Sequence, residues 1–139
     1  MACYGISVGV IVRRGDYGLF IKRARGTPGW ACPAGHHELG ENSRQTGARE
    51  VAEEVSLPVD AADLGEPLLV ETFDDQCRHG TKRHSWWVYE VEIPTGDPVR
   101  NEEETLDMCW VPLAELADLD LEPVWRTMLT KTGHIKSGG

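Results

Sequence analysis

The sequence predicts one α/β domain, built as a layered sandwich of helices on a β-sheet. Extended runs rich in β-branched residues lie on both sides of a central helical segment, and a second helical segment closes the chain. The length of 139 residues suffices for one hydrophobic core but not for two cores with a linker. These observations argue against a helical bundle and an all-β barrel, and we expect residues 1–139 to form a single domain.

The first third of the chain is predicted to form a β-hairpin followed by a loop. YGISVGVIVRR is rich in β-branched residues, RGDYG supplies a turn, and LFIKRAR is a second extended run. A hairpin is therefore expected over roughly residues 4–23. The next segment, GTPGWACPAGHHELGE, is crowded with Gly and Pro, and we expect a structured loop with no regular element across its full length.

A helix is predicted from Ser43 to Val55. Asn42 is the expected N-cap, and Gln45 three residues later completes a capping-box pattern. At about 100° per residue, one face of this helix is apolar and the opposite face carries carboxylates. The apolar residues are Ala48, Val51, Ala52 and Val55, and the carboxylates are those of Glu50, Glu53 and Glu54.

The second half of the chain contains three predicted strands and two predicted helices. LLVETF, SWWVYEVEI and MCWVP have strand composition; the polar loop DDQCRHGTKRH joins the first two, and the loop TGDPVRNEEE precedes the third. LAELADL is expected to be a short helix. PVWRTMLTKTG is expected to be a terminal helix that begins at Pro123 and ends near Gly133.

Charge and cysteine content exclude several classes of function. Fourteen basic against 23 acidic residues give a formal net charge of −9, which opposes binding to polymeric nucleic acid or anionic membranes. A small phosphorylated substrate stays compatible, since a bound divalent cation can reverse the local sign of an acidic pocket. Four dispersed cysteines without a CxxC, no positive region ahead of the first apolar stretch and no membrane-length apolar run predict a cytoplasmic protein.

Glu50, Glu53 and Glu54 follow the helical spacing i, i+3, i+4, which brings three carboxylates to one small volume. Carboxylates so close together would partly protonate, whereas a divalent cation lets all of them stay ionised. Mg²⁺ is a hard cation that prefers such oxygen ligands. A solvated helix face is the alternative explanation for a Glu-rich segment.

The residues around this segment resemble the Nudix box. The family pattern is G, five residues, E, seven residues, R-E-U-x-E-E-x-G-U, where U is aliphatic. This chain has Gly35, Glu41 and then REVAEEVSL at residues 49–57. The W-x-x-P at residues 30–33 and the later WVP, followed by a leucine-containing helix, are also similar to Nudix proteins. The resemblance therefore covers most of the chain.

The resemblance implies a Nudix-type α/β/α sandwich with a mixed β-sheet and a loop-helix-loop at the box. It implies Mg²⁺-dependent hydrolysis of a phosphoanhydride bond in a nucleoside tri- or diphosphate derivative, with Mn²⁺ as an acceptable substitute. The partner would be this small molecule, and a homodimer stays an open alternative. A non-catalytic Nudix-fold module that senses a nucleotide or binds a protein is the rival, and the intact box glutamates argue against it. An isomerase acting on an isoprenyl diphosphate ranks lower, because no motif supplies its additional Cys and Glu.

Family roles transfer to matching positions of this chain. Glu53 and Glu54 are the expected main metal ligands, the carbonyl of Gly35 is the expected backbone ligand, and Glu50 is a further ligand or the base that activates water. Arg49 is expected to pair with Glu41 or Glu50 and to orient the carboxylates.

Two other positions bear on the metal site. Many Nudix proteins add a glutamate from outside the box, and in NEEETLDMCW we choose Glu104 for this role, with Glu103 second; a solvated loop is the alternative. Ser56 stands where the family usually has Gly. If the helix ends in a left-handed conformation, serine there costs about 1 kcal/mol of strain but removes no ligand.

Candidate substrate contacts come from residues near the box. Arg23 ends the second predicted strand, Trp30 could stack on a base, His36 lies in the box loop, and Arg83 belongs to the basic loop with Arg78, His79, Lys82 and His84. The alternatives are edge-strand solubility for Arg23, core packing for Trp30, an exposed loop position for His36 and a solvated hairpin tip for the basic loop. Of the adjacent Trp86 and Trp87, only one can face a given pocket, because neighbours in a strand point to opposite sides.

Overall fold

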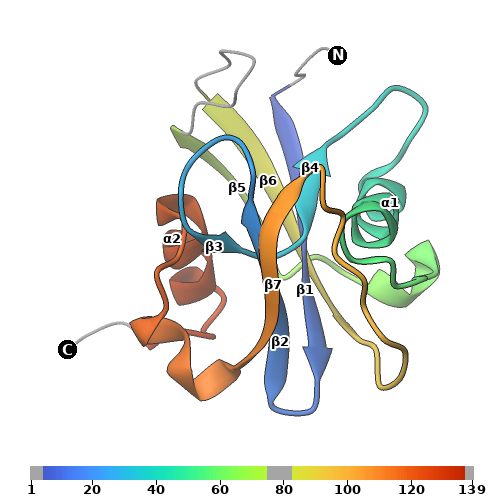
Figure 1. Ribbon diagram of the computed structural model, residues 1–139. Helices are drawn as coiled ribbons and strands as arrows, with labels where there is room; N and C mark the ends of the chain where they lie inside the picture. The colour runs from blue at the N-terminus through green and yellow to red at the C-terminus, as the bar shows by residue number, and fades with distance from the viewer. Residues whose placement is uncertain (1–4, 75–82, 137–139) are drawn as a thin grey trace.

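The computed structural model describes residues 5–74 and 83–136 (Figure 1). Within that part of the chain, seven strands form one sheet in the order β3-β2-β1-β6-β5, with β4 also paired to β1 and β7 to β2. Their bounds are β1 Ile6–Arg14, β2 Tyr17–Arg23, β3 Trp30–Ala31, β4 Ala34–His36, β5 Leu69–Asp74, β6 Arg83–Glu92 and β7 Thr105–Pro112. The β1–β6 pair is parallel and the other pairs are antiparallel, so the sheet is mixed as expected.

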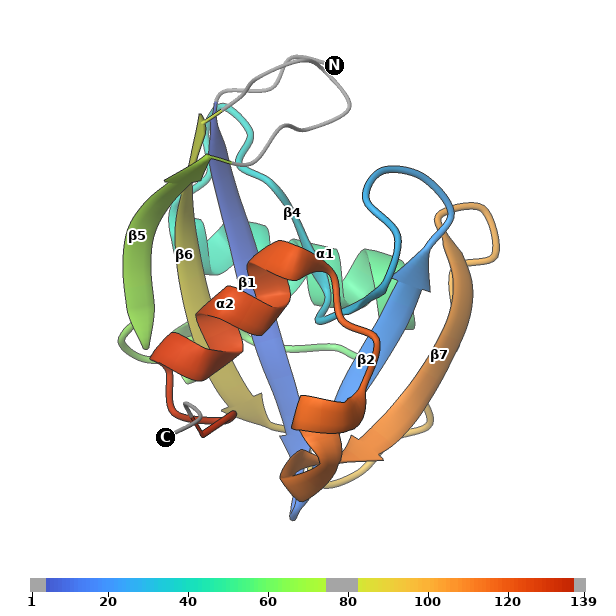
Figure 2. The same cartoon turned by 90° about the vertical axis from the view of Figure 1, so that its left-hand side faces the viewer.

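Two α-helices cover opposite faces of this sheet. Helix α1 spans Ser43–Val55 and α2 spans Pro123–Lys131, and Figure 2 shows α2 in front of the sheet with α1 behind it. Short 3₁₀ helices occupy Ala61–Leu64 (η1) and Leu113–Asp118 (η2). The predicted α/β/α sandwich is confirmed. No helix in the described ranges is long and apolar enough to span a membrane.

The sheet separates two hydrophobic clusters, one under each helix. Residues of β1 contribute to both clusters: Val8 and Val10 pack on the α1 side, whereas Ile11 packs on the α2 side. On the α2 side Trp125 is fully buried and meets Trp86 edge-on, with ring centroids 5.6 Å apart. Both faces of β1 are covered, which explains its nearly continuous apolar sequence. Trp87 contacts the other cluster, so the two tryptophans face opposite sides as expected.

The sheet forks beside β1, and this fork places β4, which contains Gly35, next to α1. β1 pairs with β2 only at Arg13 and Arg14, next to the turn, whereas its first half pairs with β4 through residues 7–9. β2 diverges to pair with β7 along its length. The short strand β4 therefore lies in the fork, where its residues face the helix that carries the glutamates.

The predicted elements agree with the structure at the hairpin, at α1 and at the start of α2. α1 has the predicted bounds, and Asn42 and Gln45 make both capping-box hydrogen bonds, each 2.9 Å long. The loop after the hairpin contains the short strands β3 and β4, β7 begins before the predicted MCWVP, the LAELADL segment is 3₁₀, and η1 was not expected. Most of the predicted loop DDQCRHGTKRH lies outside the described residues.

The predicted division of α1 into an apolar and a carboxylate face needs correction. The buried residues form two columns along the helix, one of Gly47, Val51 and Val55 against the sheet and one of Thr46, Glu50 and Glu54. Ala52, expected to be buried, is exposed. The reason is that α1 contacts β4 as well as β1, so the side chains beside Val51 and Val55 are covered although two of them are glutamates.

Candidate active site

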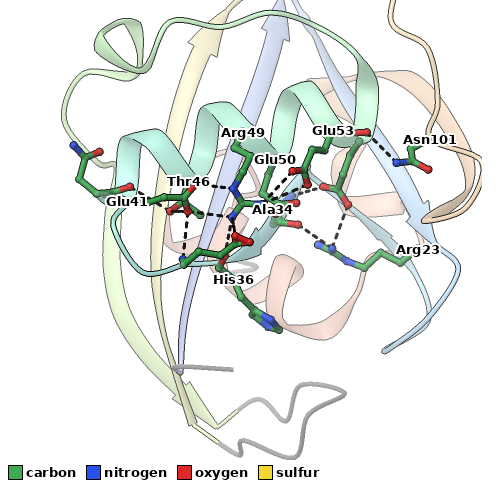
Figure 3. Close-up of polar contacts among 12 residues, drawn as sticks. Arg23, Ala34, His36, Glu41, Thr46, Arg49, Glu50, Glu53 and Asn101 are labelled. Atoms are coloured by element: carbon green, nitrogen blue, oxygen red, sulfur yellow. Dashed lines mark hydrogen bonds and ion pairs between the residues drawn. The ribbon is translucent and has the colours of Figure 1, made fainter. Parts of the chain in front are cut away.

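Three segments meet at the carboxylate column of α1 (Figure 3). The helix presents Arg49, Glu50, Glu53 and Glu54, β4 lies beside it at Ala34–His36, and Arg23 reaches in from the end of β2. The loop before β7 joins the far end of the helix: Asn101 donates from its backbone N–H to the Glu54 carbonyl, at 3.0 Å, and from its side chain to the Glu53 carbonyl, at 3.2 Å. Residues from widely separated parts of the chain thus build one site.

Arg49 is the hub of this network. Its guanidinium donates to both carboxylate oxygens of Glu41, at 2.6 and 3.1 Å, and to Glu50 Oε1 at 2.7 Å. It also donates to the His36 carbonyl at 3.0 Å. The hydrogen bond with Glu41 contributes most to raising the pKa of Arg49, and the same bond lowers the pKa of Glu41. Arg49 pairs with both of the partners that were predicted as alternatives, and it orients the carboxylates.

Glu50 is 8% exposed and lies directly against Gly35. A Cβ atom on Gly35 would lie 2.1 to 2.5 Å from the carboxylate atoms of Glu50, so a side chain at this position would displace that carboxylate or its surroundings. Burial, followed by repulsion from Glu54, raises the pKa of Glu50 to about 8, although Arg49 opposes the shift. In the absence of a cation, this carboxyl therefore tends to hold a proton near neutral pH.

Glu54 is 3% exposed and is held by two groups. The Ala34 backbone N–H donates to its Oε1 at 2.8 Å, and Arg23 Nη1 lies 3.7 Å from its Oε2. Burial raises the pKa of Glu54 to about 7, against the opposing charge of Arg23. Burial thus outweighs the nearby positive charges of Arg49 and Arg23 at both carboxyls.

Glu53 and Glu104 border this site from the solvent side. The Glu53 side chain is 48% exposed, and Arg49 Nη1 lies 3.4 to 3.5 Å from its two oxygens. Glu104 is exposed, its carbonyl accepts from the Ala24 N–H at 3.0 Å, and its charge contributes to the raised pKa of Glu54. Glu103, the second choice, is also exposed, and its backbone N–H donates to the Asn101 side chain at 3.0 Å.

The four residues predicted to contact substrate, Arg23, Trp30, His36 and Arg83, have different surroundings in the structure. Arg23 is engaged by Glu54, by Glu122 and by the Ala34 carbonyl. Trp30 is half-buried in β3, with Lys22 Nζ 5.1 Å from its ring centroid.

His36 lies in β4, and Figure 3 shows its ring pointing away from α1. Arg83 begins β6, where its backbone pairs with Asp74, but its side chain lies outside the described part. Arg78, His79 and Lys82 are also outside the described residues, as is the side chain of His84.

Sequence reasoning missed two residues of the site. Asn101 ties the loop before β7 to α1, and its position ahead of three glutamates is a typical start of an Asx-turn, which could have pointed to it. Glu122 precedes α2 and pairs with Arg23 across 99 positions of sequence. A single Glu before Pro123 gave no indication of that contact.

The donor set fits a hard divalent cation. Carboxylate and carbonyl oxygens are the ligands that Mg²⁺ prefers, and the buried Glu50 and Glu54 need positive charge to stay ionised together. Within residues 5–74 and 83–136, no three His, Cys, Asp or Glu side chains are already gathered as a metal shell. Instead, Glu50 and Glu53 face Arg49, and Glu54 faces Arg23.

Comparison with known proteins agrees with this geometry. The family model described as NUDIX domain matches residues 4–131. A Mycobacterium tuberculosis protein with the provisional name 8-oxo-dGTP diphosphatase 2 is 34% identical over 109 residues, which cover 78% of this chain and 72% of that protein. This match includes most of both chains.

Two solved structures share the fold. The Escherichia coli dihydroneopterin triphosphate pyrophosphohydrolase superposes with a TM-score of 0.77 at 22% identity, covering 94% of this chain and 96% of its own. A MutT protein from Methanosarcina mazei Go1 also gives a TM-score of 0.77, at 21% identity and 94% coverage of both chains. At these identities the likeness establishes the fold.

Proposed function

The chain belongs to the Nudix hydrolase family, and from this premise we propose that it hydrolyses a phosphoanhydride bond in a nucleoside tri- or diphosphate derivative, with Mg²⁺ as cofactor and Mn²⁺ as a substitute. The observation that carries this proposal is the convergence of the box residues. The box residues come from three successive segments: Gly35 from β4, Glu41 from the loop before α1, and Arg49 to Glu54 from α1. Their side chains and backbone meet in one half-buried network. A solvated helix face would leave Glu50 and Glu54 exposed, whereas both are buried.

In this proposal Glu53, Glu54 and the Gly35 carbonyl hold the cation, and Glu50 is either a further ligand or the base. A bound Mg²⁺ would neutralise phosphate oxygens and lower the pKa of the attacking water. The chain's own contribution is preorganisation: Arg49 fixes Glu50, and the Ala34 N–H fixes one oxygen of Glu54. Glu104 is proposed to approach from the loop before β7, whose attachment through Asn101 supports this role.

The substrate is proposed to be a nucleoside triphosphate, with 8-oxo-dGTP as the first compound to test. The name of the 34% identical Mycobacterium relative supports this choice. The surplus of acid in the chain is compatible with it, since cations in the site would compensate the phosphates. Trp30, His36 and Arg83 stay proposed contacts for the nucleotide, and the position of Arg23 points to a different role, described below.

The cellular location of the protein is proposed from its sequence and its free thiols. Cys32 and Cys109 are free, which suits a reducing compartment, and we place the protein in the cytoplasm. A single domain over residues 1–139 and a homodimer stay predictions.

The deciding experiment is a panel of nucleotides incubated with purified protein and Mg²⁺ or Mn²⁺, with product identification. Release of inorganic pyrophosphate and a nucleoside monophosphate is expected from a triphosphate. Two phosphorylated fragments from a diphosphate derivative would place the preferred bond elsewhere but keep the reaction class. Intact metal binding without turnover of any of these compounds would contradict the proposal.

A further inference from the structure

Arg23 connects the metal-site helix to the start of the C-terminal helix. Its Nε donates to Glu122 Oε2 at 3.1 Å, and its Nη1 donates to the Ala34 carbonyl at 3.2 Å. The same Nη1 lies 3.7 Å from Glu54 Oε2. Glu54 and Glu122 are 3% and 5% exposed, so one arginine serves two buried carboxylates.

The three contacts of Arg23 are of two types, hydrogen bonds and a longer ion pair. The contacts of Arg23 with Glu122 and Ala34 are hydrogen bonds, whereas 3.7 Å to Glu54 is an ion pair beyond hydrogen-bond length. The guanidinium thus compensates the charge of Glu54 without occupying its Oε2. The other oxygen, Oε1, is already held by the Ala34 N–H.

The position of Glu122 is fixed by its backbone as well as by Arg23. Its N–H donates to the Trp30 carbonyl at 2.9 Å. Gly29 packs so closely against it that a Cβ atom there would lie 2.6 Å from the Glu122 nitrogen. The Glu122 carboxylate is therefore fixed in place beside the Arg23 guanidinium.

We propose that Glu122 is a positioning residue for the metal site. It holds Arg23 back from Glu54, so that Oε2 of Glu54 remains available to a divalent cation. Without the charge of Glu122, the hydrogen bond that holds Arg23 Nε weakens, and Arg23 closes on Glu54 and competes with the cation. This inference rests on the proposed function for the identity of the site, but its test does not require turnover.

The test measures binding of Mg²⁺, and of Mn²⁺ by electron paramagnetic resonance, to the full chain without nucleotide. Glu122→Gln is expected to weaken binding by about 10- to 100-fold, the range typical of partners that orient metal ligands. Glu122→Asp, which keeps the charge, is expected to recover part of the affinity. The matched control is Glu90→Gln, because Glu90 is a partly buried carboxylate paired with Arg13 and His134 away from the box.

The control variant should leave metal affinity within about twofold of the parent protein, whatever its effect on the melting temperature. A double-mutant cycle then tests whether Glu122 acts through Arg23. In an Arg23→Gln background, Glu122→Gln should change the affinity for Mg²⁺ by less than about twofold. If Arg23→Gln does not fold, Arg23→Lys takes its place, and the coupling to Glu122 should shrink in the same direction. In an active enzyme, Glu122→Gln should lower kcat at limiting Mg²⁺ and leave the KM for nucleotide nearly unchanged at saturating Mg²⁺.

Parent-like metal affinity in Glu122→Gln, or a loss no larger than that of Glu90→Gln, would overturn the proposal. So would an undiminished effect in the Arg23→Gln background, since Glu122 would then not act through Arg23. A parent protein that binds metal but hydrolyses no nucleotide would refute the proposed function and leave this inference standing.

Discussion

At the residue scale, the feature that distinguishes this site is that its buried carboxylates are individually held. Glu50 is hydrogen-bonded to Arg49, and Glu54 is hydrogen-bonded to Ala34. Glu53 has only long contacts with Arg49 and is about half exposed. Two glutamates buried and hydrogen-bonded at the base and a half-exposed one at the rim thus give chemically identical side chains different surroundings.

The half-exposed Glu53 is the residue whose change should affect chemistry with the least effect on folding. Glu53→Gln is expected to lower kcat by several orders of magnitude, because it removes a proposed metal ligand. The melting temperature should stay close to that of the parent protein, since exposed substitutions rarely change stability by more than about 0.5 kcal/mol. A nearly normal rate would refute the role assigned to Glu53.

The raised pKa values of Glu50 and Glu54 predict how the metal-free protein responds to pH. A carboxyl whose pKa is raised on folding stabilises the fold fully below its unfolded pKa of 4.5, and this stability is lost as pH rises through the folded values of about 7 and 8. Denaturant unfolding of the metal-free protein should therefore show decreasing stability between about pH 5 and pH 8.

Two controls separate this effect from others. Glu50→Gln and saturating Mg²⁺ should each reduce the decline, because the first removes one titrating group and the second stabilises the ionised carboxylates. Glu41 acts in the opposite direction and in a different window: its pKa is lowered, so its stabilisation is lost only as pH falls below about 4.5. Rising stability from pH 5 to pH 8 without metal would contradict the burial of the pair.

Gly35 is predicted to be intolerant of any side chain. In Gly35→Ala the new methyl group would lie within 2.5 Å of the Glu50 carboxylate, so that carboxylate, the strand or the helix must shift. We expect a loss of about 1–3 kcal/mol in the free energy of unfolding. Metal affinity should fall with it, because Glu50 is displaced. Parent-like stability and metal binding, measured by denaturant unfolding and titration, would show that the close contact can relax.

At the element scale, the helix end shows what the one departure from the box does. Ser56 has φ of 60° and ψ of 28°, and it is the one non-glycine residue with positive φ among those described. Its N–H donates to the Ala52 carbonyl, and its hydroxyl donates to the Val99 carbonyl at 3.1 Å. The left-handed cap considered from the sequence is present, and serine adopts it.

Replacing this serine should therefore change stability and not chemistry. Ser56→Gly is expected to stabilise the protein by about 0.5–1 kcal/mol, because glycine adopts this conformation without strain, with the lost hydroxyl bond reducing the gain. Ser56→Ala is the matched control: it keeps the strain, loses the bond to Val99 and should be less stable than the parent. Measured by denaturant unfolding, a destabilising Ser56→Gly would show that the hydroxyl outweighs the strain.

Local sequence predicted the elements whose determinants are local. The bounds of α1 follow from Asn42, Gln45 and the turn at Ser56, which are all contacts within a few residues. The strands β3 and β4 could not be predicted in the same way, because they exist only through pairing with β2 and β1. The burial of Glu50 and Glu54 depends on where β4 lies, so helical periodicity alone could not predict that their side of the helix is covered.

At the scale of the whole molecule, the fork in the sheet determines the site. Because β2 leaves β1 after the turn to pair with β7, β4 can pair with the first half of β1 beside α1. The box motif identified residues that the structure brings together, namely Gly35, Glu41, Arg49 and Glu50. It could not predict that Arg23 joins Glu54 to Glu122, since these residues belong to β2, α1 and the start of α2.

The measurement that tests the metal-dependent hydrolase assignment most directly is the rate of nucleoside triphosphate hydrolysis, including 8-oxo-dGTP, as a function of Mg²⁺ concentration, for the parent protein and Glu53→Gln. We predict that the parent releases pyrophosphate only when Mg²⁺ or Mn²⁺ is present, and that Glu53→Gln loses this activity while remaining folded. Hydrolysis that persists in excess chelator, or equal rates for the two proteins, would contradict the assignment of the α1 carboxylates as a metal-dependent hydrolytic site.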